Sequence, residues 1–180
     1  MNTKTKSILS FGLIYGLILI ALALIPYVFN LPQSKIFGYI NIAVVVASLF
    51  IIQRLYKKQV YNNRIKYGQL LGGSVLIVLV AVALTTAYTY TFYTLIAPEQ
   101  IDELKNLAYM ELMERGISDS YLDMQISIMD KYFTAKSLTI SIFFSNLLTG
   151  FVIVLILGVI NKSKADSLYT EVFEEENSNS

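Results

Sequence analysis

Neighbouring carboxylates are the residues whose type and spacing come closest to a chemical site in this sequence. Asp102 with Glu103, and Glu111 with Glu114, would lie close together on a helix, and their oxygens suit a divalent cation. No loop of the EF-hand pattern accompanies them, so we interpret them as a solvated acidic face. The same interpretation covers the later acids of this segment, Asp119, Asp123 and Asp130. We therefore predict no metal site, no cofactor and no catalytic residue.

The missing residue types restrict the chemistry further. The 180-residue chain has no Cys and no His, so it lacks thiolates, disulfides and the usual general base. No Asp, Glu, Lys, Arg or His stands in the interior of a long apolar run, which disfavours a proton-coupled carrier.

Four long apolar runs define the architecture. The chain is 55% hydrophobic and 15% charged, and about 20 apolar residues suffice to cross a bilayer as a helix. A lone strand cannot satisfy its backbone in lipid, so the runs must be helices. We predict an all-α integral membrane protein with transmembrane helices over residues 7–29, 36–56, 68–97 and 137–160. The first run exceeds the usual length of a signal-peptide core, so we expect it to remain as a helix.

The distribution of charge predicts the orientation. Eight Lys or Arg precede the first acid, Glu99. With four spans, both termini and the second connection share one side, which collects nine basic residues against five on the other. The positive-inside rule therefore places both termini in the cytoplasm and residues 98–136 outside. The stretch "RLYKKQVYNNRIK" that follows the second run is interpreted as a determinant of topology rather than a nucleic-acid site.

The exported segment, 98–136, carries eight acids and four basic residues and reads as two amphipathic helices. Pro98 and Glu99 favour a helix start, Gly116 suits its end, and Ser118 or Ser120 can cap the second helix. The apolar repeats are Ile101, Leu104, Ala108 and Leu112, then Leu122, Ile126, Met129 and Phe133. We expect a hairpin whose apolar faces pack together, rest on the membrane or meet a partner. Residues 1–160 are predicted as one membrane domain and 161–180 as a disordered, acidic cytoplasmic tail.

Small and polar residues inside the runs are candidates for helix packing. Small residues four apart let helix backbones approach, within one chain or in a dimer. Asn146 lies deep in the fourth run, where we expect an interhelical hydrogen bond; a substrate contact is the alternative. The packing candidates are Gly12, Gly16, Gly68, Gly72, Ser141, Ser145, Asn146 and Thr149.

The order of these features resembles a known family. "IKYGQLLGGSVLI" opens the third run, "LIAPEQIDELKNLAYMELMERGISDSYLDMQISIMDKYFT" fills the exported segment, and a Gly-containing last run is followed by Lys. Pro98, Gly116 and Ser118 match the recurring pattern of the domain of unknown function 4199 family. The resemblance implies a small four-helix protein of a bacterial inner membrane and implies no reaction.

Function is expected to reside in the exported segment, the one sizeable polar part between the runs. The leading hypothesis is a non-enzymatic interaction or accessory subunit with a protein partner at the hairpin. The alternatives are a small oligomeric transporter or channel, and a membrane enzyme that uses the exported carboxylates. The expected partners are the lipid bilayer, a protein and further copies of the chain, with no nucleic acid.

Overall fold

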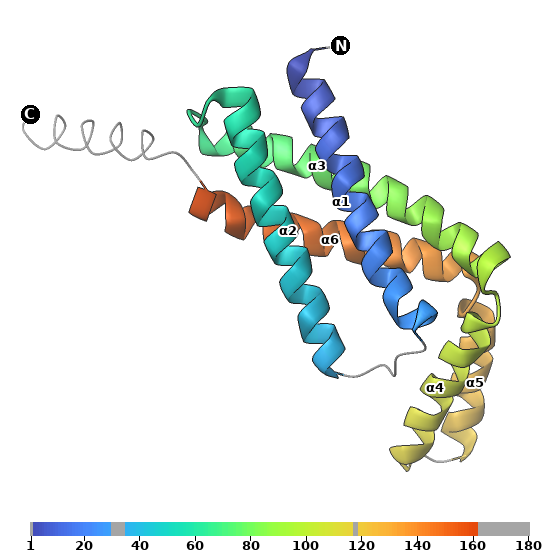
Figure 1. Ribbon diagram of the computed structural model, residues 1–180. Coiled ribbons are helices and arrows are strands. Elements are labelled where there is room, and N and C mark those ends of the chain that lie inside the picture. Colours follow the sequence, from blue (N-terminus) through green and yellow to red (C-terminus); the bar gives the residue numbers. More distant parts are fainter. Residues whose placement is uncertain (1, 30–34, 117–118, 162–180) are drawn as a thin grey trace, which may run out of the picture. The chain divides into compact units, whose positions relative to one another are not determined.

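The computed structural model describes residues 2–29, 35–116 and 119–161, all helical apart from their connections (Figure 1). The elements in order are α1 (Thr3–Val28), α2 (Lys35–Tyr61), α3 (Tyr67–Thr91), the π-helix η1 (Phe92–Ile96), α4 (Gln100–Glu114), α5 (Asp119–Tyr132) and α6 (Ala135–Asn161). They divide into two compact units, of which one ends at Leu84 and resumes at Asn146, and the other spans Thr85–Ser145. Each unit is described by itself.

Four helices of the described residues are long and apolar enough to cross a membrane. They are Thr3–Val28, Ile36–Tyr61, Tyr67–Ile96 and Ala135–Asn161. This confirms the predicted all-helical architecture with four apolar helices. The helix boundaries differ from the predicted spans by a few residues: α1 begins at Thr3, and α2 continues past Tyr56 to Tyr61 and so carries Lys57 and Lys58 on the helix itself. The basic stretch that sequence reasoning assigned to a connection is therefore in large part helical.

Small residues let the helices of the first unit approach each other. α1 packs along α2. Toward α3, a Cβ built on Gly12 of α1 would lie 2.5 Å from Cβ of Val80, and one on Gly16 would lie 3.3 Å from Cα of Ala81. Such distances leave no room for a side chain, so the backbones of α1 and α3 meet closely at these two glycines.

Glycines also let α3 lie close to α2 and to α6. The ring of Tyr56 on α2 occupies the space where a Cβ of Gly73 would lie. On α6, a Cβ at Gly150 would lie 2.6 Å from Cγ1 of Val78, and one at Gly158 would lie 3.0 Å from the Tyr67 ring. The core between the helices is mostly apolar, with Leu49, Ile52, Leu70, Ile77, Val82, Val154 and Leu157 among its buried side chains.

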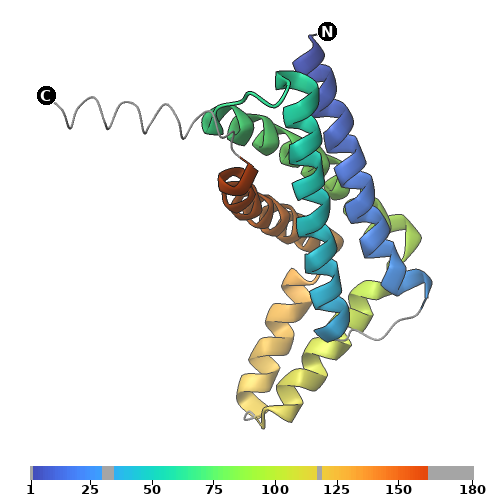
Figure 2. The same cartoon turned by 60° about the vertical axis from the view of Figure 1, so that its left-hand side comes forward.

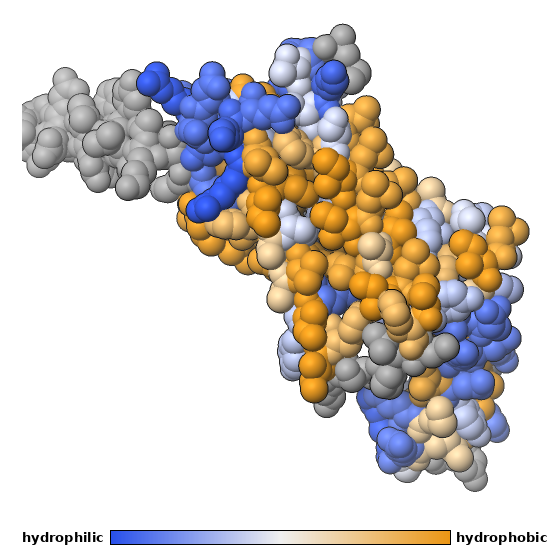
Figure 3. Space-filling model, viewed as in Figure 1, coloured by the Kyte–Doolittle hydropathy of each residue, from blue (hydrophilic) through white to orange (hydrophobic). Residues whose placement is uncertain are grey.

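The outer faces of the first unit are apolar as well. Large hydrophobic side chains are exposed along its helices, among them Leu13, Leu17, Ile40, Ile42, Leu76, Val152 and Ile156. Figure 3 shows this apolar surface over α1 and α2, with polar residues gathered at the end of α2. A helix that is apolar all round is typical of a membrane span.

The second unit contains the end of α3, the start of α6 and the two short helices. The Thr94 hydroxyl of η1 donates to the carbonyl of Tyr90, near the end of α3, over 2.7 Å. Helices α4 and α5 then lie side by side (Figure 2). Gly116, directly after the C-cap of α4, has a φ of +63°, the left-handed conformation that favours glycine. Its predicted role as the stop of that helix is thereby confirmed.

Two further predictions fall outside the residues described. Ser118 and the tail from Lys162 onward are not covered, and the side chain of Ser120 is not described either. The predicted cap of α5 and the predicted disorder of the tail therefore stay predictions.

Candidate functional site

The basic end of α2 is the first candidate site, and the local sequence explains its shape. Arg54, Lys57 and Lys58 stand near the C-terminal end of the helix, after its long apolar run. Asn62 and Asn63, with φ values of 46° and 67°, then turn the chain, since Asn tolerates the left-handed region better than most residues. The backbone N–H of Asn63 donates to the backbone carbonyl of Lys57 over 3.2 Å. This turn holds Asn63 beside the cationic side chains of the helix end.

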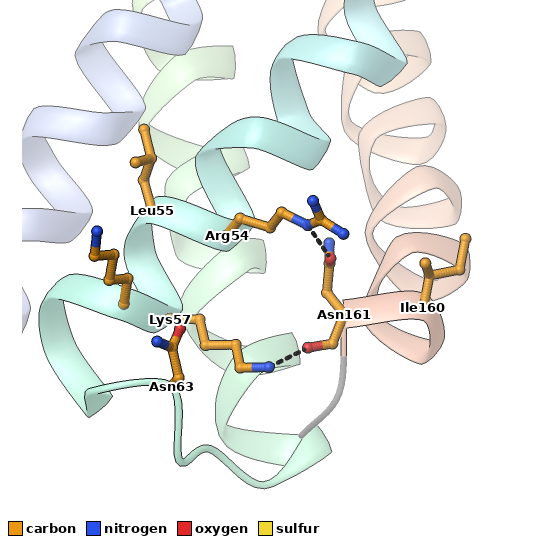
Figure 4. Close-up of a pocket in the computed structure, with 7 residues that line it drawn as sticks. Arg54, Leu55, Lys57, Asn63, Ile160 and Asn161 are labelled. Atoms are coloured by element: carbon orange, nitrogen blue, oxygen red, sulfur yellow. Dashed lines mark hydrogen bonds between the residues drawn. The ribbon is translucent and has the colours of Figure 1, made fainter. Parts of the chain in front are cut away.

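Asn161, the last residue of α6, links this helix end to α6. Arg54 Nε donates to its side-chain oxygen over 3.3 Å, and Lys57 Nζ donates to its backbone carbonyl over 3.0 Å (Figure 4). Its own amide donates to Oε1 of Gln53 over 3.0 Å, and Gln53 Nε2 reaches the carbonyl of Val154 at 3.5 Å. Gln53 is fully buried and Asn161 nearly so. Asn161 therefore orients the side chains of Arg54 and Lys57, and the buried hydrogen bond to Gln53 holds Asn161 in place.

A pocket of about 300 Å³ opens among these groups. Its lining consists of Arg54, Leu55, Lys57, Lys58, Asn63, Ile160 and Asn161 (Figure 4). The guanidinium of Arg54 lies 4.3 Å from the centre of the Phe50 ring, a cation–π contact that holds it in place. Among the described residues, three cations and no anion line the pocket, so it is suited to a negatively charged ligand.

The second candidate is the outward face of the hairpin formed by α4 and α5. The predicted apolar repeats, from Ile101 to Leu112 and from Leu122 to Phe133, are half-buried, and Met129 is buried. A second apolar set points outward from the two helices and was not predicted. We call it the exposed ridge: Leu107, Met110 and Met113 on α4, with Tyr121, Met124, Ile128 and Tyr132 on α5.

Ion pairs and hydrogen bonds engage part of the hairpin's charge. Lys105 Nζ on α4 lies 3.1 Å from Oδ1 of Asp130 on α5. Along α4, Arg115 pairs with Glu111 at 2.6 Å. The residues described include no group of three or more His, Cys, Asp or Glu that is arranged to hold a metal ion.

The predicted packing glycines have unequal surroundings. Gly12 and Gly16 meet α3, whereas a Cβ on Gly68 or Gly72 would have no described atom within 4 Å. The close approach on α3 is at Gly73, one residue beyond the predicted pair. Spacing alone identified residues that share a face and did not show which face meets a neighbour.

The polar candidates on α6 do not pack closely within the described chain, and their predicted role in a dimer stays a prediction. Ser141, Ser145 and Thr149 are exposed, and Asn146 is half-buried. Among the described residues, the interhelical amide hydrogen bond is made by Asn161 with Gln53. The signal for this pair was a lone Gln inside the second apolar run, where an amide needs a partner.

These features define the class: a helical protein whose four long apolar helices indicate multiple passes through a membrane. The chain matches the family described as "Protein of unknown function (DUF4199)" over residues 10–163 and belongs to that family. The predicted resemblance is thereby confirmed. No curated protein and no solved structure matches the chain.

Proposed function

We propose that the protein is a non-enzymatic interaction or accessory subunit of a bacterial inner membrane, which binds a partner protein through its exported hairpin. The observation that carries the proposal is the exposed ridge. Met110 and Met113 are 53% and 54% exposed on α4, and Met124 is 50% exposed on α5. Exposed apolar side chains concentrated on the hairpin favour an interaction surface, and Met adapts well to a partner's shape.

Charge favours a protein over the membrane surface as the occupant of the ridge. The segment 98–136 has a net charge of −4, and the exposed acids Asp102 and Glu114 lie beside the ridge on α4. Anionic lipid repels such a surface, whereas it attracts basic segments. The partner chemistry that fits is an apolar groove bordered by Lys or Arg, which buries the ridge and pairs with its acidic rim.

Photo-crosslinking from single positions tests this proposal. A photoreactive residue at Met110, Met113 or Met124 is expected to yield one and the same protein adduct in cells. Controls at Asp123 and Asp130 are exposed and lie at least about 100° around α5 from every ridge residue on that helix. They should crosslink far less.

Two outcomes would contradict the proposal. One is equal crosslinking from ridge and control positions, and the other is crosslinking from the ridge to lipid alone. As a second arm, deletion of Glu99–Phe133 should remove the adduct-forming partner from the purified complex while the four long helices still insert. Full retention of the partner after this deletion would place its binding surface elsewhere.

A further inference from the structure

The pocket at the end of α2 has a positive charge that no described residue of its unit neutralises. The chain has no acid before Glu99, and the described part of α6 has none either. Within the described residues of the first unit, the cations of the pocket therefore face amide and carbonyl oxygens and no carboxylate. Carbonyl and amide oxygens orient a cation without cancelling its charge, so the pocket keeps a positive potential.

The cations also keep hydrogen-bond donors available. Arg54 uses Nε toward Asn161, and its two terminal nitrogens donate to no other described residue. Lys57 makes a single hydrogen bond, and Lys58 makes none to the described part of the chain. Asn161 fixes Arg54 and Lys57 in place, which leaves the outer edge of the guanidinium free for a bidentate contact with phosphate oxygens.

The walls of the pocket are apolar on the outer side. Leu55 is 46% exposed and Ile160 is 61% exposed, and each lies on a helix apolar enough to span the membrane. A ligand with a charged group and hydrocarbon chains would contact both parts of this lining at once. Basic pockets between membrane helices commonly bind anionic lipid headgroups.

We propose that this pocket binds an anionic phosphate group, carried by a phospholipid headgroup or present as free phosphate. Arg54 and Lys58 contact the phosphate oxygens, Lys57 supports them, and Leu55 with Ile160 contacts the first methylenes when the phosphate belongs to a lipid. The site does not depend on the hairpin or on its partner.

Native mass spectrometry of the full chain in detergent, titrated with phosphatidylglycerol, tests the site. The wild type is expected to retain one phosphatidylglycerol more tightly than phosphatidylcholine. The pocket double variant Arg54→Gln with Lys58→Gln should bind phosphatidylglycerol at least about tenfold more weakly. The reason is that each cation near a charged headgroup adds to the binding free energy. The matched control, Arg64→Gln with Lys66→Gln, removes the same charge from the adjoining connection without touching the pocket lining, and should change binding less than about twofold.

Inorganic phosphate identifies the source of the phosphate group. If it binds as tightly as the lipid and displaces it, the ligand is free phosphate; if only phosphatidylglycerol binds, the ligand is a headgroup. Either result supports the proposal. Equal weakening by both double variants would show diffuse charge attraction and overturn it, as would unchanged binding by the pocket variant. Should the pocket variant unfold, Lys58→Gln alone, which removes no hydrogen bond within the described residues, is expected to weaken binding about fivefold, and wild-type binding by it would overturn the proposal.

Discussion

The side-chain amide of Asn161 donates to Oε1 of Gln53 over 3.0 Å, and this hydrogen bond joins α6 to α2 at the buried base of the basic pocket. The two residues are 108 positions apart in the sequence. Because Asn161 also accepts from Arg54 and Lys57, the pair sets where both cations lie. Packing of the helices and the geometry of the pocket therefore depend on the same contact.

Replacing Gln53 by Leu should destabilise the fold by about 1 kcal/mol, because the amide of Asn161 loses its buried acceptor. In a double-mutant cycle with Asn161→Leu, we expect a coupling free energy of similar size. Thermal unfolding followed by circular dichroism measures both. Gln59→Leu, an exposed change on the same helix, serves as the control. A coupling near zero would mean that the hydrogen bond does not hold α2 and α6 together.

Gly12→Ala should cost about 1–3 kcal/mol, because the new methyl would lie 2.5 Å from Cβ of Val80, which no side-chain rotation can move. Gly72→Ala is the matched control, since its methyl would meet no described atom within 4 Å, and its better helix propensity should leave stability unchanged or raised. Melting temperatures of the two variants, measured in the same detergent, compare their stabilities. Equal destabilisation would show that Gly72 also makes a close contact, for instance in an oligomer.

The stability of the hairpin should depend more on the burial of apolar side chains than on the ion pair between Lys105 and Asp130. Met129 is only 9% exposed, so Met129→Ala is expected to lower the free energy of unfolding by about 2 kcal/mol or more. Lys105→Ala removes the ion pair with Asp130, whose side chain is 67% exposed, and should cost less than about 1 kcal/mol. Hydrogen exchange of the α5 amides measures both effects. Faster exchange in Lys105→Ala than in Met129→Ala would reverse this order of importance.

The elements that the sequence predicted are those set by local chemistry. The four spans follow from run length and hydropathy, and the end of α4 follows from the left-handed preference of Gly116. The inner face of the hairpin was predicted from the helical spacing of its apolar residues. Its exposed ridge was missed because Met110, Met113 and Met124 form a second apolar face, and periodicity does not tell which of two faces is covered.

The parts that escaped prediction depend on contacts between distant segments. A four-residue spacing made Gly68 and Gly72 look like packing sites, although Tyr56 of α2 packs on Gly73. The basic residues Arg54, Lys57 and Lys58 looked like a determinant of topology. Only their position opposite Asn161 shows that they line a pocket. A single sequence carries the charges and cannot show which distant residue faces them.

The central claim is that the hairpin lies outside the cell's interior while the basic end of α2 lies within it. The chain has no Cys, so single-cysteine variants can be labelled without background. Asp123→Cys on the exposed surface of α5 and Gln59→Cys near the end of α2 are the informative pair. With a membrane-impermeant maleimide on intact spheroplasts, we predict labelling of Asp123→Cys at once and of Gln59→Cys only after permeabilisation. Labelling in the reverse order, or of both variants in intact spheroplasts, would contradict the account.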